Sequence, residues 1–158
     1  MNTIEKTSVS LARFTSPDLV VPELCEQTPA GVARELNGLL HRHAALPESF
    51  FLTPAALCRE LLTNTTLDCG MLVAQLRSTP VARTCFAFGR VRQPLPWRAQ
   101  RLTPVQFICL AVESTGSSAE YRRVLAALTR LATQIDAIAE LRSASTAEEI
   151  LSVLERFS

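Results

Sequence analysis

The chain lacks a strong net charge and any long uninterrupted apolar segment. Its 158 residues carry 16 basic and 15 acidic side chains, a formal net charge of +1, so the molecule as a whole has no strong attraction for nucleic acid or anionic lipid. No segment approaches the roughly 20 apolar residues that a membrane-spanning helix requires, and the N-terminal MNTIEKTSVSLARF lacks the apolar core of a secretion signal. We therefore expect a cytoplasmic protein that neither binds nucleic acid nor inserts into a membrane.

Histidine is scarce, which limits the possible metal chemistry. The chain has only His41 and His43, and two positions apart on a predicted helix they face different sides, which argues against a zinc pair. Five cysteines are widely spaced and mostly lie in apolar runs, which is typical of reduced core residues in a cytosol. They are Cys25, Cys58, Cys69, Cys85 and Cys109. We predict no metal site and no cofactor.

Acidic residues are absent between Asp68 and Glu113, although this interval contains many arginines. They are Arg77, Arg83, Arg90, Arg92, Arg98 and Arg101. This pattern has two interpretations: a basic face that meets an acidic partner, or arginines that solvate the outside of a sheet and its loop. We favour the second. Aromatic residues that could stack on bases are few in this interval, so nucleic-acid binding is not supported.

The composition predicts one compact domain. The sequence is 47% hydrophobic and 20% charged, as in globular proteins, and its length suits a single core. We expect a flexible N-terminus over residues 1–9 and one domain over 10–158. Thr-Pro pairs at Thr28-Pro29 and Thr53-Pro54 predict two helix starts, with threonine as the N-cap. The first of these helices is expected to end before Pro47.

Later segments predict strands and helices that alternate along the chain. The segments predicted as strands are Asp18–Val21, Met71–Leu76, Ala82–Val91 and Val105–Val112, the last being apolar throughout and therefore central and buried on both faces. A loop at Pro94–Trp97 should end the third of them. Helical stripes over 121–131 and 135–141 precede a capping box, Thr146-x-x-Glu149, that opens a final helix. This order predicts an α/β fold in which helices cover both faces of a sheet.

The segment from Leu57 to Arg77, LCRELLTNTTLDCGMLVAQLR, carries a family resemblance. An Arg-Glu pair on a predicted helix leads through a Thr-rich turn at 63–66 and Gly70 into a short apolar strand that ends on Gln75, with a basic residue close behind. This arrangement resembles the phospho-acceptor segment of the type-2 enzyme IIA proteins of bacterial phosphotransferase systems, in particular the nitrogen-related branch. The resemblance implies a three-layer fold with a mixed sheet of about five strands.

In that family the short strand ends on a histidine that accepts a phosphoryl group, and here its place is held by Gln75. A carboxamide nitrogen cannot attack phosphorus as a neutral imidazole nitrogen does, because its lone pair is delocalised into the carbonyl. A second family histidine aligns with Glu120. The resemblance thus implies a degenerate site without a catalytic residue, made of Arg59, Thr65, Asp68, Gly70, Gln75, Arg77 and Glu120. It lies between the segment 70–77 and the helix after Ser118.

The residues and the resemblance together lead to a primary hypothesis and two alternatives. The first is a regulatory protein that binds target proteins of the transporter or kinase type. Because it lacks the phospho-accepting histidine, we do not expect it to be an enzyme. The second is an active phosphocarrier that uses His41 or His43 as a displaced acceptor. The third is a redox switch at Cys69, although Asp68 beside it should raise the thiol pKa and lower its reactivity.

Overall fold

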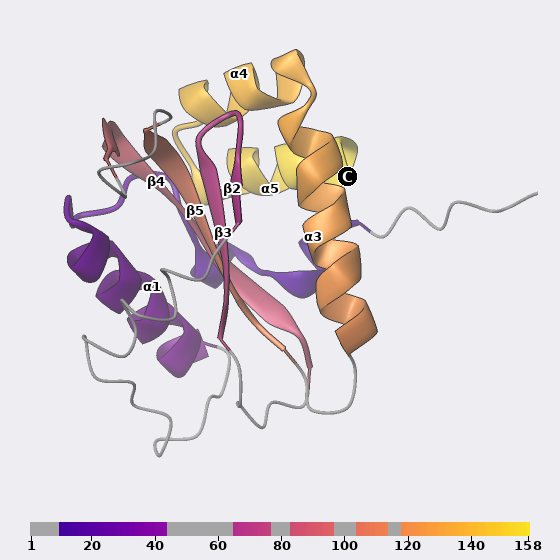
Figure 1. Cartoon of the computed structure of the whole chain (residues 1–158), viewed down its shortest axis with the longest axis horizontal. Helices are drawn as coiled ribbons and strands as arrows, with labels where there is room; N and C mark the ends of the chain where they lie inside the picture. The colour runs from indigo at the N-terminus through magenta and orange to yellow at the C-terminus, as the bar shows by residue number, and fades with distance from the viewer. Residues whose placement is uncertain (1–9, 44–64, 77–82, 97–103, 114–117) are drawn as a thin grey trace, which may run out of the picture.

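The computed structural model describes residues 10–43, 65–76, 83–96, 104–113 and 118–158, and in this part of the chain a five-stranded sheet lies between two layers of helices (Figure 1). The strands are β1 (Val20–Val21), β2 (Thr65–Leu67), β3 (Met71–Leu76), β4 (Cys85–Leu95) and β5 (Val105–Val112). The helices are α1 (Pro29–His43), α3 (Ser118–Ala132), α4 (Ile135–Ser143) and α5 (Ala147–Arg156), with short 3-10 turns η1 (Leu11–Phe14) and η2 (Pro17–Leu19). The predicted α/β class, with a mixed sheet covered on both faces, is confirmed.

The central strand is β5, as its unbroken apolar sequence predicted. The strand order is β1-β4-β5-β3-β2; β5 pairs parallel with β3 and antiparallel with β4, and β2 and β3 form an antiparallel hairpin. Successive β5 side chains enter opposite faces of the sheet: Phe107 and Cys109 join one core, and Ile108 and Leu110 the other. Because both faces are covered, no polar alternation is required in this strand.

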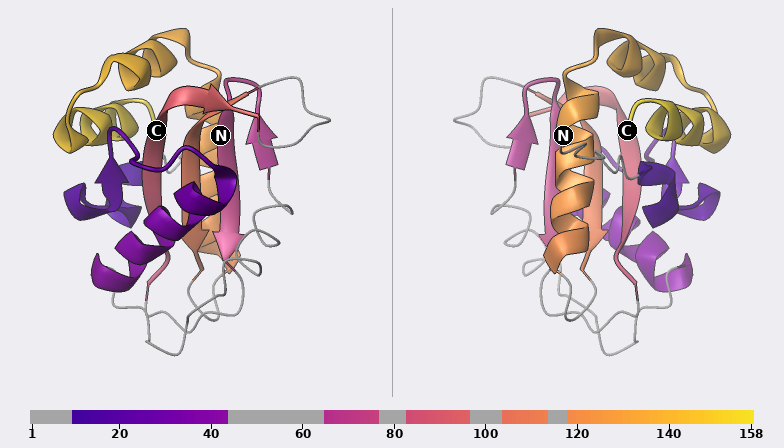
Figure 2. Two further views of the ribbon diagram at one scale, coloured as in Figure 1. Left: turned by 90° about the vertical axis from the view of Figure 1, so that its left-hand side faces the viewer. Right: turned by 90° about the vertical axis from the view of Figure 1, so that its right-hand side faces the viewer.

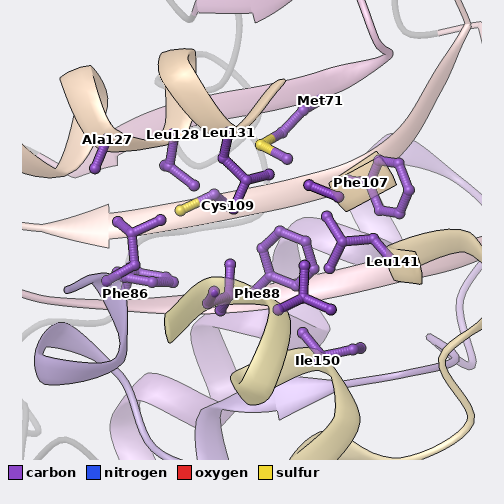
Figure 3. Close-up of a cluster of buried hydrophobic side chains, with 14 of the residues drawn as sticks. Met71, Phe86, Phe88, Phe107, Cys109, Ala127, Leu128, Leu131, Leu141 and Ile150 are labelled. Carbon is purple, nitrogen blue, oxygen red and sulfur yellow. The ribbon is translucent and has the colours of Figure 1, made fainter. Parts of the chain in front are cut away.

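Each face of the sheet has its own hydrophobic core. One lies under α3, α4 and α5, where Phe86, Phe88 and Phe107 from the sheet are fully buried (Figure 3). The other lies under α1, which runs obliquely across the opposite face (Figure 2) and buries Val32, Leu36 and Leu40 among other residues. Between the two cores, the parallel pairing of β3 with β5 places the carboxyl ends of these strands side by side.

Two helix starts follow the local signals in the sequence. The Thr28 hydroxyl accepts a hydrogen bond from the backbone N–H of Gly31 (3.1 Å) at the start of α1. At α5 the Thr146 hydroxyl accepts from the N–H of Glu149 (3.1 Å), and the Glu149 carboxylate accepts in return from the N–H of Ser145 (2.9 Å). This return bond reaches the residue before the cap, one position earlier than in the usual capping box. Each cap contributes about 1 kcal/mol.

The predicted limits were wrong at β4 and at the turn that precedes β3. The strand expected to end at Val91 continues as β4 to Leu95, through Pro94. Pairing with β5 is irregular between Arg90 and Leu95 and resumes where Leu95 meets Val105, so Pro94 is accommodated where the regular ladder is interrupted. The turn expected at residues 63–66 is also displaced: Thr65 and Thr66 belong to β2, and the reversal is made by residues 68–70.

Other predictions fall on residues outside the described part of the chain. These are the flexible segment 1–9, the end of the first helix at Pro47 and the helix opened by Thr53-Pro54. Within the described part, no helix is long and apolar enough to cross a membrane. The predicted strand at Asp18–Val21 is shorter than expected, because Pro17–Leu19 forms a 3-10 turn and only Val20 and Val21 pair with β4.

Candidate functional site at the carboxyl ends of β3 and β5

The carboxyl ends of β3 and β5 lie side by side because the two strands are parallel and in register, with Gln75 opposite Ala111. Alternation places Gln75 on the same face as Met71 and Val73, whose side chains pack under α3 to α5. Glu113 follows β5 directly and takes the face of Ala111 by the same alternation. The sheet therefore brings together two polar side chains that are far apart in the sequence.

These two side chains are in contact. The Gln75 side-chain amide, Nε2, donates a hydrogen bond to Oε2 of the Glu113 carboxylate, and both residues are half-buried. The other carboxylate oxygen, Oε1, is buried and has no hydrogen-bond partner among the described residues. Within the same residues, no basic side chain forms an ion pair with Glu113. The Glu113 carboxylate is therefore hydrogen-bonded to the Gln75 amide at the edge of the core.

The N-terminus of α3 lies at this same end of the sheet (Figure 1). Glu120, in its first turn, is half-buried, and a carboxylate there interacts favourably with the positive end of the helix dipole. The described residues show no hydrogen bond or ion pair between Glu120 and Gln75. The structure thus places Gln75 and Glu120 at the same end of the sheet. It adds Glu113, which the sequence analysis did not identify as a candidate site residue.

Two other expected residues of this segment lie away from Gln75, and a third lies close to it. Asp68 and Gly70 lie in the β2–β3 turn, at the opposite end of β3, and the five residue steps from Gly70 to Gln75 span about 16 Å. Thr65 pairs with Val73, two positions before Gln75, so the backbone of Thr65 is a diagonal neighbour of Gln75 across the hairpin, about 7–8 Å away. The turn therefore cannot cradle a group held at position 75, and the charge of Asp68 is too distant to repel such a group by direct contact.

Gly70 has a structural role in its turn. Its φ of +87° is a conformation that side chains with a Cβ rarely adopt. A Cβ there would lie 2.6 Å from the carbonyl oxygen of Pro104. The Gly70 carbonyl accepts hydrogen bonds from the N–H groups of Gln106 (2.8 Å) and Phe107 (3.2 Å). The glycine thus allows the hairpin to approach the start of β5.

The cysteine in this turn is poorly suited to redox chemistry. Burial raises the pKa of the Cys69 thiol; backbone hydrogen bonds and the charge of Arg142 partly oppose this effect, and Asp68 adds to it. Burial also raises the pKa of Cys85, although Arg83 lowers it in part. Cys109 is fully buried, and its pKa is raised as well. These thiols stay protonated at neutral pH, which lowers their reactivity.

The arginines that the structure describes in the acid-free interval bind parts of the same molecule. Arg90 donates from Nη1 to the carbonyls of Leu141 (2.7 Å) and Arg142 (2.8 Å), at the C-terminal end of α4. Arg92 pairs with Glu23 at 2.5 Å on the surface. This supports the interpretation that these arginines solvate and brace the sheet. Arg59, Arg77, Arg98 and Arg101 lie outside the described residues.

Both histidines lie on the opposite face of the sheet from Gln75. His41 and His43 belong to the last turn of α1, and α1 packs on the core that contains Leu72 and Ala74 rather than Met71 and Val73. Figure 2 shows the C-terminal end of α1 on the side of the molecule away from β3. In the described part of the chain, no group of three histidine, cysteine or acidic residues could hold a metal ion.

Comparisons with known proteins place this fold in a family. The family model of the phosphoenolpyruvate-dependent sugar phosphotransferase system, EIIA 2, matches residues 36–157. The chain therefore belongs to this family of phosphotransferase-system IIA proteins. No curated protein gives a significant sequence match.

Solved structures with the same fold include two kinds of IIA protein. The nitrogen regulatory protein IIA-Ntr of Neisseria meningitidis is 23% identical, with a TM-score of 0.75 over 91% of this chain and 98% of its own. The mannitol-specific cryptic enzyme IIA CmtB of Escherichia coli is 13% identical, with a TM-score of 0.68 over 94% and 99%. The Escherichia coli complex of enzyme IIA-mannitol with phosphorylated enzyme IIB is matched with 16% identity and a TM-score of 0.68 over 88% and 95%.

Proposed function

We propose that this chain is a nitrogen-regulatory type of IIA protein that has lost its phospho-accepting histidine and acts as a regulatory protein-interaction module. The observation that carries the proposal is the contact between Gln75 and Glu113 at the carboxyl end of β3. Gln75 holds the place that the family resemblance assigns to the phospho-histidine. Its amide nitrogen is already engaged as a donor and has no lone pair available for attack on phosphorus.

The position of the two histidines supports the same proposal. A displaced acceptor would have to receive the phosphoryl group at the surface where a donor protein docks. His41 and His43 lie on α1, over the other core of the sheet, and neither follows a Gly-rich turn that could cradle phosphate. The alternative of an active phosphocarrier thus finds no support at these residues.

The proposed activity is binding to target proteins in a single, unswitched state. The solved complex of enzyme IIA-mannitol with phosphorylated enzyme IIB is an example of a protein of this fold bound to a partner protein. In a phosphorylatable relative, gain of the phosphoryl group changes the charge of the binding surface and so can alter partner choice. A chain with Gln75 cannot be switched in this way, so its binding surface keeps the same charge at all times. Its partners would be regulatory targets of the transporter or kinase type in the cytoplasm.

A transfer assay tests the proposal. The purified chain is incubated with phosphoenolpyruvate carrying a labelled phosphoryl group and with the general phosphotransferase enzymes. We expect no acid-labile label on the wild-type chain, while a histidine-containing IIA protein in the same mixture is labelled. Acid-labile label on His41 or His43 of the wild-type chain would establish the phosphocarrier alternative. His41→Gln and His43→Gln variants identify the acceptor in that event.

A binding experiment tests the interaction role. Immobilised wild-type chain and Gln75→Glu and Gln75→His variants capture partners from the source cells, and bound proteins are compared by mass spectrometry. We expect at least one partner that is captured by the wild-type chain and whose captured amount differs for the variants at position 75. An unchanged set of partners across all three would show that this end of the sheet is not the binding surface.

A further inference from the structure

Glu113 has no role in the family pattern that identified this segment, yet it makes the closest polar contact of Gln75. Its carboxylate accepts the hydrogen bond of the Gln75 amide through Oε2, and its Oε1 is buried without a hydrogen-bond partner among the described residues. A buried acceptor left without a donor is unfavourable for folding. Cys109 and Ala111, the preceding β5 residues on this face, belong to the hydrophobic core, whereas Glu113 does not.

The geometry of the contact resembles a phosphorylated imidazole in one respect. The Nε2 atoms of glutamine and histidine are the same number of bonds from Cα, and a phosphoryl group on a histidine would extend from such a nitrogen. In this chain the group that extends from the nitrogen of Gln75 is the Glu113 carboxylate. Both groups are anions that present oxygen acceptors, although the phosphoryl group carries more charge.

We propose that the Glu113 carboxylate occupies the place of the phosphoryl group and closes this position to phosphoryl transfer, even when a histidine is restored at residue 75. The inference rests on the proposed function and goes beyond it, because loss of the histidine alone does not require any such acid. An incoming phosphoryl group would meet a carboxylate of like charge in a half-buried site, where solvent screens the repulsion poorly. The native chain thus carries a permanent, partial imitation of the phosphorylated state.

A pair of variants tests the inference directly. Gln75→His alone restores the imidazole beside the carboxylate, and Gln75→His with Glu113→Gln restores it beside a neutral side chain of the same size. In the variant reaction, the phosphorus–nitrogen bond of the donor's phosphohistidine breaks and a new one forms to residue 75, while the donor imidazole retains the electron pair of the broken bond. We expect labelling of the double variant to be at least tenfold faster than that of Gln75→His.

A matched control uses a carboxylate remote from this site. Glu155, exposed on α5, provides the same chemical change when Glu155→Gln is combined with Gln75→His. This control variant should be labelled as slowly as Gln75→His alone. If it were labelled as fast as the Glu113 double variant, the effect would come from net charge and the inference would fail. Label on the wild-type chain would instead defeat the proposed function, so the two failures are distinguishable.

A second measurement does not depend on transfer by other enzymes. A carboxylate in contact with an imidazole raises the pKa of that imidazole, by about one unit or more at this distance. An NMR titration of the histidine ring in folded Gln75→His and in the double variant should show this shift, and Glu120 is common to both proteins. Equal imidazole pKa values in the two variants, or equal labelling rates, including no label on either, would overturn the inference.

Discussion

The two ends of β3 use polar groups in different ways. At the turn end, the Gly70 carbonyl is hydrogen-bonded to the start of β5, and the glycine itself has the positive φ that the close approach demands. At the carboxyl end, Gln75 and Glu113 contact each other, and one carboxylate oxygen remains without a partner among the described residues. Residues at the turn end are explained by the fold, whereas those at the carboxyl end are not. This difference is the basis on which we propose the carboxyl end as the functional surface.

The largest expected effect is at the turn end. Gly70→Ala places a Cβ 2.6 Å from the Pro104 carbonyl oxygen at a φ of +87°, so we expect a loss of about 2–3 kcal/mol in the free energy of unfolding. Gly38→Ala, on α1, is the control, since the nearest atom is the flexible end of Arg42 at 3.7 Å. It should stabilise the helix by about 0.5–1 kcal/mol. Urea unfolding measures both, and equal effects would contradict the role given to Gly70.

The next effect concerns the brace between the sheet and α4, also near the turn end. Arg90→Met keeps most of the side-chain stem but removes both hydrogen bonds to the carbonyls of Leu141 and Arg142, so we expect a loss of about 1–2 kcal/mol. Arg92→Met removes only the exposed pair with Glu23, whose side chains are 67% and 52% exposed, and should change stability by less than about 0.5 kcal/mol. A reversed order in thermal or urea unfolding would show that the bonds of Arg90 do not brace α4.

A smaller effect is expected at the carboxyl end. Glu113→Gln replaces a partly desolvated carboxylate by a neutral amide that can still accept from Gln75, so the free energy of unfolding should change by less than about 1 kcal/mol and in the stabilising direction. A loss of more than about 2 kcal/mol would identify Glu113 as a structural residue and remove the contrast between the two ends of β3.

The smallest expected effect concerns the reactivity of the cysteine thiols. Cys25 is exposed, whereas Cys69 and Cys85 are half-buried with raised pKa values and Cys109 is buried. Alkylation of the native protein followed by peptide mapping should modify Cys25 first, Cys69 and Cys85 slowly and Cys109 only after unfolding. If Cys69 reacted fastest, the turn end would have a reactive site and the redox alternative would return.

The sequence predicted those parts of the fold that depend on neighbouring residues. The threonine caps at Thr28 and Thr146 act within a single turn of helix. The unbroken apolar sequence of β5 is by itself enough to predict that this strand is buried. Strand β2 was missed because its three residues have no alternation of their own and pair only through the hairpin. The extension of β4 was missed because the irregular pairing that accommodates Pro94 depends on its partner strand.

The candidate site was only partly predictable for the same reason. Gln75 was found because a local family pattern surrounds it. Glu113 lies 38 positions further along the chain and has no motif of its own; its importance comes from the parallel pairing of β3 and β5, which brings the two carboxyl ends together. The rule that sites form at the carboxyl ends of parallel strands could have suggested it. Asp68 was included because it is close in sequence, although the length of β3 separates it from Gln75.

The most direct test of the account is phosphoryl transfer to the wild-type chain, with and without Glu113→Gln. With labelled phosphoenolpyruvate and the general phosphotransferase enzymes, we predict no acid-labile label on either protein, because both retain Gln75 and neither presents an imidazole at the carboxyl end of β3. Stable, acid-labile labelling of the wild-type chain, at any histidine, would contradict the claim that this protein has lost its function as a phosphoryl acceptor.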